Sequence, residues 1–280
     1  MPRYLADHFT RCLCGFGILS ALCLPLNSSA ENPITSRALL PAIAVVTSCS
    51  GTVKQLDEDG KKRKLRLRET LPLNETSFST ASNSSLFLCL SNGIGLGLGE
   101  STSIRIQRYE QSMINPMHAG LNFENSVSHL RIQTEAGKIA VAFNHLNPLS
   151  KAEFILPVGT LIVHSGQFLL EVDPNSACSV IAYKGTATFY QKDSTEREFV
   201  APGKGISISP ESVQRFAVDQ SKLETAPMQN DSLLIAATEF TRKRILFRHN
   251  PDGEQPLQQW ILPEKRLDQA IARPFQFKLK

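Results

Sequence analysis

Glycine occupies every second position of one short segment of this 280-residue sequence: Gly93, Gly95, Gly97 and Gly99. Glycine-rich turns can hold phosphate, and the dinucleotide-binding pattern G-x-G-x-x-G needs a third glycine at a fixed spacing before a helix. That position is Leu98 when counted from Gly93 and Glu100 when counted from Gly95. The following residues, 101–107, alternate like a strand, so no helix N-terminus is available to bind an anion. The spacing therefore argues against a nucleotide site.

The same spacing predicts a strand with two unlike faces. Successive strand residues point to opposite sides, so Ile94, Leu96 and Leu98 share one face while the glycines leave the other face bare. Because glycine weakens a strand, a bare face usually marks the close approach of another backbone or of a bulky neighbour. We expect neighbouring chain to lie directly on the glycine face.

Two pairs of residues could support hydrolysis. Glu171 and Asp173 would share a strand face, and paired carboxylates can act in glycosidases, but Asp173 begins a turn with Pro174. His164 and Ser165 are adjacent in a predicted strand, so they point in opposite directions, and no G-x-S-x-G motif surrounds them. The other histidines lack metal-ligand spacings such as H-E-x-x-H. We therefore predict no catalytic residues, no metal, no cofactor and no enzymatic activity.

One basic run stands out as a candidate binding surface. It holds six cations within eight residues: Lys61, Lys62, Arg63, Lys64, Arg66 and Arg68. Such a run could bind phosphate or sulfate groups of a lipid or polysaccharide. The interpretation that we favour is a solvated hairpin whose cations face Asp57, Glu58 and Asp59 and discourage edge-to-edge pairing of strands. We take these six cations as the possible ligand or partner surface.

The elements that must position these residues are mostly strands. From Ala42 to about Val218, short alternating or β-branched runs are separated by Gly, Pro, Asn and Asp. Asp59-Gly60 predicts a hairpin turn, after which Leu65 and Leu67 alternate with the cations. Eleven further strands are predicted over residues 84–91, 94–99, 102–109, 129–135, 137–143, 152–158, 160–165, 167–172, 178–185, 186–192 and 205–210. Residues 109–127 lack a clear pattern and are predicted to form a surface loop or a short helix.

The pattern changes near Ser221, where we place a domain boundary. Asp231 and Ser232 can cap a helix whose apolar residues repeat at helical spacing and whose basic end, residues 241–244, suits the helix dipole. Residues 263–274, bounded by prolines, predict a second short helix. The C-terminal tail, residues 221–280, is therefore predicted to contain one or two short helices.

The first thirty residues have the composition of a secretory signal peptide. An uncharged apolar run, residues 12–26, is followed by small residues at Ser28 and Ala30, and it is shorter than the ~20 residues of a membrane-spanning helix. The alternative is an uncleaved signal that anchors the chain in the inner membrane. Three cysteines lie beyond the signal, and an odd number widely spaced is no disulfide framework, although Cys49 and Cys178 could pair after export. The net charge of +4 at pH 7 is too small to indicate nucleic-acid binding.

The order of the segments resembles the FecR domain, an exported β-rich module of regulators of iron transport. In that family an early G-x-V strand precedes a Thr-rich step, a strand pair around an Asn-Gly or Asp-Gly turn, and an acidic-Ser strand. The matching segments here are residues 50–53, 78–90, 91–101 and 102–106, followed by 129–141, 154–163, 163–172, 182–189 and 200–208. Ser165-Gly166 stands where the family usually has Gly-Thr, which is a departure from its pattern.

The resemblance implies the sensing or docking half of such a regulator. Complete members carry a cytoplasmic anti-sigma segment and a membrane helix ahead of this module, whereas eleven residues precede the apolar run here, too few to fold into a unit that binds a sigma factor.

We therefore expect an all-β fold, either a sandwich or a solenoid-like stack of short strands, with a short helical tail. The expected organisation is a signal peptide (1–30), a FecR-like β-domain (42–220) and the tail (221–280). The expected function is a non-catalytic binding or signalling module of the periplasm or cell envelope that docks a protein partner through a strand edge or exposed loops. The alternative is a protein that binds a glycan or surface polymer through the basic run. We expect no nucleic-acid partner, and membrane contact only if the signal is uncleaved.

Overall fold

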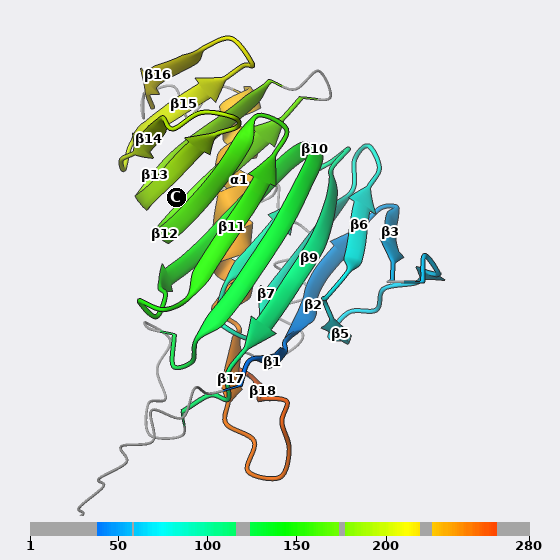
Figure 1. Ribbon diagram of the computed structural model, residues 1–280. Coiled ribbons are helices and arrows are strands. Elements are labelled where there is room, and N and C mark those ends of the chain that lie inside the picture. The colour runs from blue at the N-terminus through cyan, green and yellow to red at the C-terminus, as the bar shows by residue number, and fades with distance from the viewer. Residues whose placement is uncertain (1–37, 58, 116–123, 174–176, 219–225, 262–280) are drawn as a thin grey trace, which may run out of the picture. The chain divides into compact units, whose positions relative to one another are not determined.

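The chain folds into a layered all-β structure with one C-terminal helix, as the sequence predicts (Figure 1). The computed structural model describes residues 38–57, 59–115, 124–173, 177–218 and 226–261. The predicted signal peptide and the second predicted helix lie outside these residues. Within them, no helix is both long and apolar enough to cross a membrane.

Sixteen strands hydrogen-bond into one continuous sheet that folds back on itself as two halves. The half that faces the viewer in Figure 1, here named the first sheet, contains β4 (Lys62–Arg63), β3 (Val53–Leu56), β6 (Thr76–Thr80), β9 (Ser103–Gln111), β11 (Lys151–Leu156) and β14 (Arg197–Val200), with β1 (Leu40–Pro41) beside β9. The second sheet contains β5 (Thr70–Pro72), β2 (Ile43–Ser50), β7 (Ser85–Leu90), β8 (Gly95–Leu98), β15 (Lys204–Ile208) and β16 (Val213–Ala217).

Three long strands belong to both sheets: β10 (Ser128–His145), β12 (Gly159–Val172) and β13 (Cys178–Gln191). The first part of β10 pairs with β9 and β11, and its second part pairs with β8 and β12. Each long strand changes direction at a glycine with positive φ: Gly137, Gly166 and Gly185. Gly166 and Gly185 face each other, and a Cβ on Gly185 would lie 1.6 Å from the carbonyl oxygen of Ser165. Strands that bend from one sheet into the other are a known way to build the corners of a sandwich.

These long strands correct the predicted strand boundaries. Residues 129–135 and 137–143 were expected as two strands, as were 160–165 with 167–172 and 178–185 with 186–192; each pair is one strand in the structure. The glycine between the two halves bends the strand instead of ending it, because the hydrogen-bonded ladder continues on both sides. Sequence alone could not separate a sandwich from a solenoid, and the pairing describes a sandwich.

The core lies between the two sheets. Ile104, Ile132 and Phe154 of the first sheet pack in one buried cluster with Leu96 and Phe168 of the second sheet. These five side chains are fully buried. The alternating apolar residues of both sheets therefore point at each other across the sandwich, as the period of two predicts.

The glycine strand is confirmed, and the chain that covers its bare face is helix α1 (Ala226–Arg242). A Cβ on Gly95 would lie 2.9 Å from the backbone oxygen of Thr238. A Cβ on Gly97 would lie 2.1 Å from Oγ1 of the same Thr238, and one on Gly99 3.4 Å from Leu234. The helix therefore rests directly on the strand backbone, on the far side of the second sheet in Figure 1.

The tail also contains a hairpin that the sequence pattern did not predict, formed by β17 (Ile245–Arg248) and β18 (Leu257–Trp260). Ile245 packs in a small cluster with Val45 and Cys89 on the outer face of the second sheet, and Phe247 and Trp260 border it. Helix α1 begins at Ala226, five residues before the predicted cap at Asp231. The described part of the tail thus packs on the sandwich as a third layer.

Replacing Gly97 with valine should displace α1 while leaving the sandwich folded. The new side chain would collide with Thr238, and overpacking of this kind costs about 1–3 kcal/mol of unfolding free energy. Trp260 is the only tryptophan, so its fluorescence reports on the tail. We expect a red shift of its emission with an unchanged far-ultraviolet β signal. Gly99→Ala is the control, since its nearest neighbours lie at 3.3–3.4 Å; equal effects of the two variants would contradict the proposed contact.

Candidate functional site

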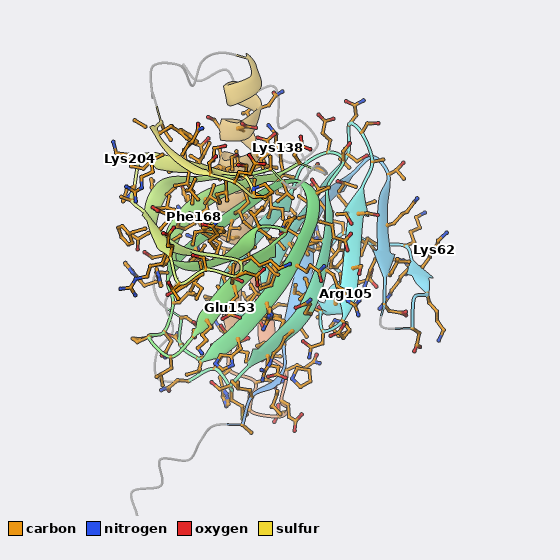
Figure 2. All side chains as sticks on the ribbon, turned by 45° about the horizontal axis from the view of Figure 1, so that its top comes forward. Lys62, Arg105, Lys138, Glu153, Phe168 and Lys204 are labelled. Atoms are coloured by element: carbon orange, nitrogen blue, oxygen red, sulfur yellow. The ribbon has the colours of Figure 1, made fainter. Side chains whose placement is uncertain are left out.

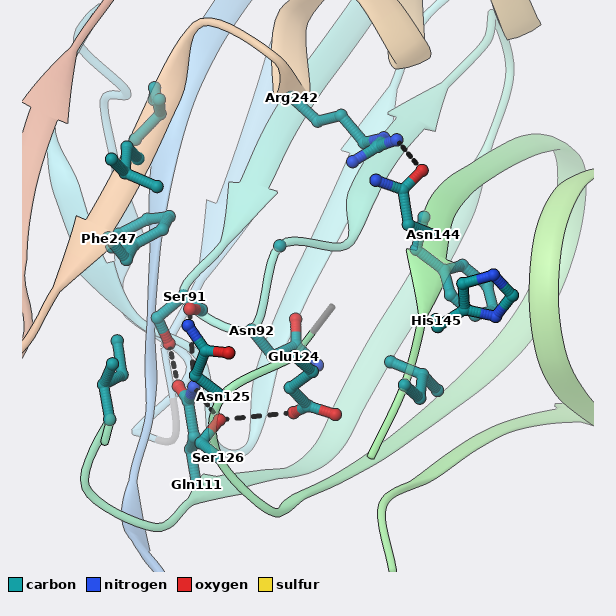
Figure 3. Close-up of a pocket in the computed structure, with 16 residues that line it drawn as sticks. Ser91, Asn92, Gln111, Glu124, Asn125, Ser126, Asn144, His145, Arg242 and Phe247 are labelled. Carbon is teal, nitrogen blue, oxygen red and sulfur yellow. Dashed lines mark hydrogen bonds between the residues drawn. The ribbon is translucent and has the colours of Figure 1, made fainter. Parts of the chain in front are cut away.

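A polar cavity lies where the ends of several strands meet the C-terminal tail (Figure 3). Ser91 and Asn92 come from the turn between β7 and β8, and Gln111 from the end of β9. The segment before β10 provides Glu124, Asn125 and Ser126, the end of β10 provides Asn144 and His145, and the tail provides Arg242 and Phe247. The cavity has a volume of about 60 Å³.

Its floor is a chain of buried hydrogen bonds. Ser91 bonds to the hydroxyl of Tyr109 (3.1 Å) and donates to Oε1 of Gln111. Gln111 donates to Ser126 (2.6 Å), and Ser126 donates to Oε1 of Glu124 (3.4 Å). Every link joins buried side chains, so the network satisfies its own polar groups and fixes the strand ends relative to one another.

Glu124 is the one buried carboxyl group of this cavity, with 5% of its surface exposed. Burial raises its pKa above the ordinary value, although hydrogen bonds from Ser128, Ser150, the backbone N–H of Asn147 (3.0 Å) and Ser126 oppose the shift. The fold therefore makes ionisation of Glu124 less favourable than that of a glutamate in water.

Arg242 closes the cavity from the side of the helix. Its guanidinium donates to both carboxylate oxygens of Glu239 and to Oδ1 of Asn144 (2.8 Å), a bond drawn in Figure 3. Burial would raise the pKa of Glu239, but the bonds from Arg242 and Lys243 hold it below its ordinary value. The sequence indicated that the basic end of the helix interacts favourably with the helix dipole. In the structure the buried side chain of Arg242 also connects α1 to the end of β10.

The small volume of the cavity and the hydrogen bonds among its own side chains limit what it can do chemically. A volume of about 60 Å³ has room for a few water molecules only. Small-molecule sites usually enclose several hundred Å³. No group of three or more His, Cys, Asp or Glu side chains among the described residues could hold a metal ion. We therefore regard the cavity as a structural polar junction.

The two residue pairs that were weighed for hydrolysis have partners elsewhere in the fold. Glu171 lies 3.4 Å from Nζ of Lys138, which also binds Asp231 of α1 at 2.9 Å. Burial alone would lower the pKa of Lys138, but these two carboxylates raise it above the ordinary value. His164 is exposed, and its Nε2 lies 3.2 Å from the hydroxyl of Thr188. Through Lys138, Glu171 thus belongs to the contact between the sheet and α1.

The basic run forms the predicted hairpin but not a long second strand. β4 spans only two residues, and Leu65 is buried whereas Leu67 is exposed, so the expected alternation ends early. A turn follows, in which Arg68 has a φ of 68°. Figure 2 shows Lys62 at the far end of the hairpin, projecting from the rest of the sandwich.

The structure divides the six cations instead of gathering them. Lys61 pairs with Asp59 (2.9 Å) and Arg63 with Glu69 (2.7 Å). Arg68 lies over the ring of Trp260, 5.5 Å from its centroid, and so belongs to the contact with the tail. Lys62, Lys64 and Arg66 remain exposed on the hairpin. The hairpin therefore carries less free positive charge than its sequence indicates.

The three cysteines beyond residue 30 are all free thiols. Cys49 is exposed on β2, and Cys178 is buried at the start of β13, so the disulfide considered from the sequence is not formed. Burial raises the pKa of Cys178 to about 11 and that of Cys89 to about 12. The two buried thiols therefore remain protonated and unreactive at neutral pH.

An exposed apolar area lies on the outer side of the first sheet, across β12, β13 and β14. We name it the aromatic face: Thr160, Ile162, Thr188, Tyr190 and Phe199. The register places Thr188 opposite both Ile162 and Phe199, and Tyr190 opposite Thr160, so the five side chains are neighbours on one side of the sheet. Phe199 is 61% exposed and Tyr190 40%. No described element packs on this face, whereas α1 covers the outer side of the second sheet.

Sequence reasoning missed both the cavity and the aromatic face. Glu124 lies at the end of residues 109–127, which had no pattern and were expected to form a surface loop or a short helix. Phe199 lies outside every predicted strand. A strand-like alternation at residues 197–200 could have signalled β14, but four residues are too few for a clear period.

Comparisons with known proteins give no family assignment. No protein-family model and no curated protein sequence matches this chain. Two crystal structures of a "putative anti-sigma factor" from Parabacteroides distasonis ATCC 8503, at 2.50 and 1.65 Å, are similar to 71% of this chain and 91% of theirs. Each has 10% sequence identity and a TM-score of 0.39, which is too distant to carry a functional argument. The FecR resemblance therefore stays a prediction.

Replacing Glu124 with glutamine should change how stability depends on pH. Because the folded-state pKa is raised, the parent loses stability as pH rises from the ordinary glutamate value through the folded value, where the buried group must ionise. The melting temperature of Glu124→Gln minus that of the parent should therefore increase from pH 4 to pH 8. Glu153→Gln, on the outer side of the first sheet, is the control. Parallel pH profiles for Glu124→Gln and the parent would contradict this account.

Arg68→Ala should lower stability more than removal of the hairpin cations does. Loss of the contact with Trp260 costs about 0.5–2 kcal/mol and shifts the tryptophan emission. A combined replacement of Lys61, Lys62, Arg63 and Lys64 with alanine should leave the unfolding midpoint nearly unchanged, because exposed ion pairs contribute little. Urea denaturation followed by fluorescence measures the unfolding midpoints of both variants. A larger loss of stability in the quadruple variant would contradict the distinction between Arg68 and the hairpin cations.

Proposed function

We propose that this chain is an exported, non-catalytic binding module of the bacterial envelope that docks a protein partner through the aromatic face. The proposal depends on a difference between the outer faces of the two sheets. Helix α1 covers the outer face of the second sheet, whereas Phe199 and Tyr190 are exposed on the outer face of the first sheet.

The chemistry of the aromatic face suits a protein partner. Aromatic side chains are enriched at the centres of protein interfaces because they bury a large area with few rotatable bonds. Thr160 and Thr188 between them add hydroxyl groups that can bond to a partner. Phe199 would lose the most solvent-accessible surface on binding, because it is the most exposed aromatic side chain among the described residues.

Export and location at the periplasm or envelope rest on the sequence of residues 1–30, and the docking role rests also on the FecR resemblance. That the chain is not an enzyme rests on its sequence, which lacks a G-x-S-x-G motif and metal-ligand spacings. The polymer-binding alternative retains only Lys62, Lys64 and Arg66 as free cations on the hairpin, so we rank it second.

The proposal predicts specific cross-links from the aromatic face. A photoreactive amino acid at position 190, expressed in the source bacterium and irradiated, should give discrete protein adducts identifiable by mass spectrometry. The same amino acid at position 105, on the outer side of β9 away from the aromatic face, is the control. Phe199→Ser should weaken the adducts from position 190. A lack of protein adducts at 190, together with binding of the purified chain to acidic polysaccharide, would favour the alternative.

A further inference from the structure

We infer that the free edge of β14 binds an extended segment of the partner, and that this segment carries a carboxylate two residues away from an apolar side chain. The inference rests on the proposed function, because it specifies how the partner of the aromatic face is held. It depends on three features: the hydrogen-bond pattern of β14, the state of the other sheet edges, and the side chains beside the free edge.

The hydrogen-bond pattern shows which backbone groups of β14 are free. The N–H of Gln191 donates to the carbonyl of Glu196, so these two residues form a hydrogen-bonded pair in the turn that leads from β13 to β14. In an antiparallel ladder such pairs alternate with pairs that share no bond. The backbone of Glu198 is therefore hydrogen-bonded to that of Phe189, whereas Arg197 and Phe199 direct their N–H and C=O groups away from β13.

No described strand lies on that other side of β14, which pairs with β13 alone. The backbone groups of Arg197 and Phe199 thus form a short template for an added strand. Exposed strand edges are commonly used in this way to bind extended peptides, with the main chain providing affinity and alternate side chains providing specificity.

Two other edges of the sandwich, at β4 and at β16, are less suited to this role. The opposite edge of the first sheet ends in the hairpin of β3 and β4, where exposed cations discourage strand addition. At the edge of the second sheet, Arg215 of β16 forms an ion pair with Glu198 of β14, and 71% of the Arg215 side chain stays exposed. This ion pair also uses the carboxylate of Glu198, so Glu198 does not offset the charge of Arg197.

The side chains beside the free edge define the partner. Arg197 and Phe199 both point to the outer side of the sheet, where the aromatic face continues from them. Arg197 is exposed and forms no ion pair with a described side chain, so a carboxylate is the complementary neighbour on an added strand. Phe199 needs an apolar neighbour. These two positions are ~7 Å apart along a strand, which is the distance between residues i and i+2 of an extended partner.

A defined peptide can test this inference without knowledge of the natural partner. The probe is a labelled, capped octapeptide in which glutamate and valine alternate at every second position, with threonine between them. The matched probe has lysine in place of glutamate. Fluorescence anisotropy with the folded chain should show the glutamate peptide binding about two- to fivefold more tightly, since one cross-strand charge pair contributes on that scale. Equal affinities would contradict the inferred role of Arg197.

Two sets of variants separate the side chain from the backbone. Arg197→Glu should reverse the preference, so that the lysine peptide binds more tightly. Arg197→Pro should bind more weakly than Arg197→Ala, because proline removes an N–H that points to the free edge while the ladder with β13 stays intact. Lys192→Glu, an exposed charge reversal in the preceding turn, is the control. An unchanged preference in Arg197→Glu, or equal binding by the proline and alanine variants, would overturn the inference.

Unfolding midpoints and far-ultraviolet spectra show whether each variant is folded; Arg197→Glu keeps the backbone N–H, so the charge test stands even where Arg197→Pro is unstable. The cross-linking experiment distinguishes failure of this inference from failure of the proposed function. Adducts from position 190 that persist undiminished in Arg197→Pro would mean that the aromatic face binds a protein without strand addition. A lack of adducts in the parent would instead contradict the docking role itself.

Discussion

The arrangement of the molecule depends on one close contact, between the backbone of β8 and helix α1. Two strand residues span ~6.6 Å and four helix residues span ~6 Å, so glycines at every second position can meet helix residues at every fourth. Gly99, Gly97 and Gly95 meet Leu234, Thr238 and Arg242 in this way. Side chains on that face of β8 would hold the helix away from the sheet. The bare face therefore fixes both the position and the direction of the tail.

That contact determines where the ends of the tail lie. With Arg242 held against Gly95, its guanidinium reaches Asn144 at the end of β10 and closes the polar cavity. The chain continues directly into β17, which covers Val45 and Cys89. The cavity, the buried arginine and the hairpin are thus consequences of one helix placement. The buried polar groups of Glu124 and Gln111 bond to residues from the strand ends and their connections, among them Ser91, Ser126 and Asn147.

The sequence predicted contacts correctly where a periodic residue pattern within one segment indicates them. It did not predict contacts between segments that are distant in the sequence. The period of two at residues 93–99 predicted both the strand and the covered face, because glycines on one face leave room for a closely packed neighbour. It could not show that the neighbour is α1, since no signal links residues 95 and 242. Glu124 has no periodic context, and its burial arises from Ser126, Asn147 and other residues that meet only in the fold. The long strands were divided at glycines because a bend and a turn have the same local signature.

The unequal outer surfaces of the sandwich then bear on function. A sheet in a sandwich has two faces and two edges, and each must be solvated, covered or charged. Here α1 covers one outer face, the hairpin of β3 and β4 charges one edge, and Arg215 with Glu198 ties a second edge to β14. Besides the short strand β5, which ends the second sheet at Pro72, the edge of β14 and the aromatic face beside it remain, and these two are continuous through Phe199. A partner strand placed there would satisfy the free backbone groups of β14 and cover Phe199 in the same step, whereas a polymer held by exposed lysines would do neither.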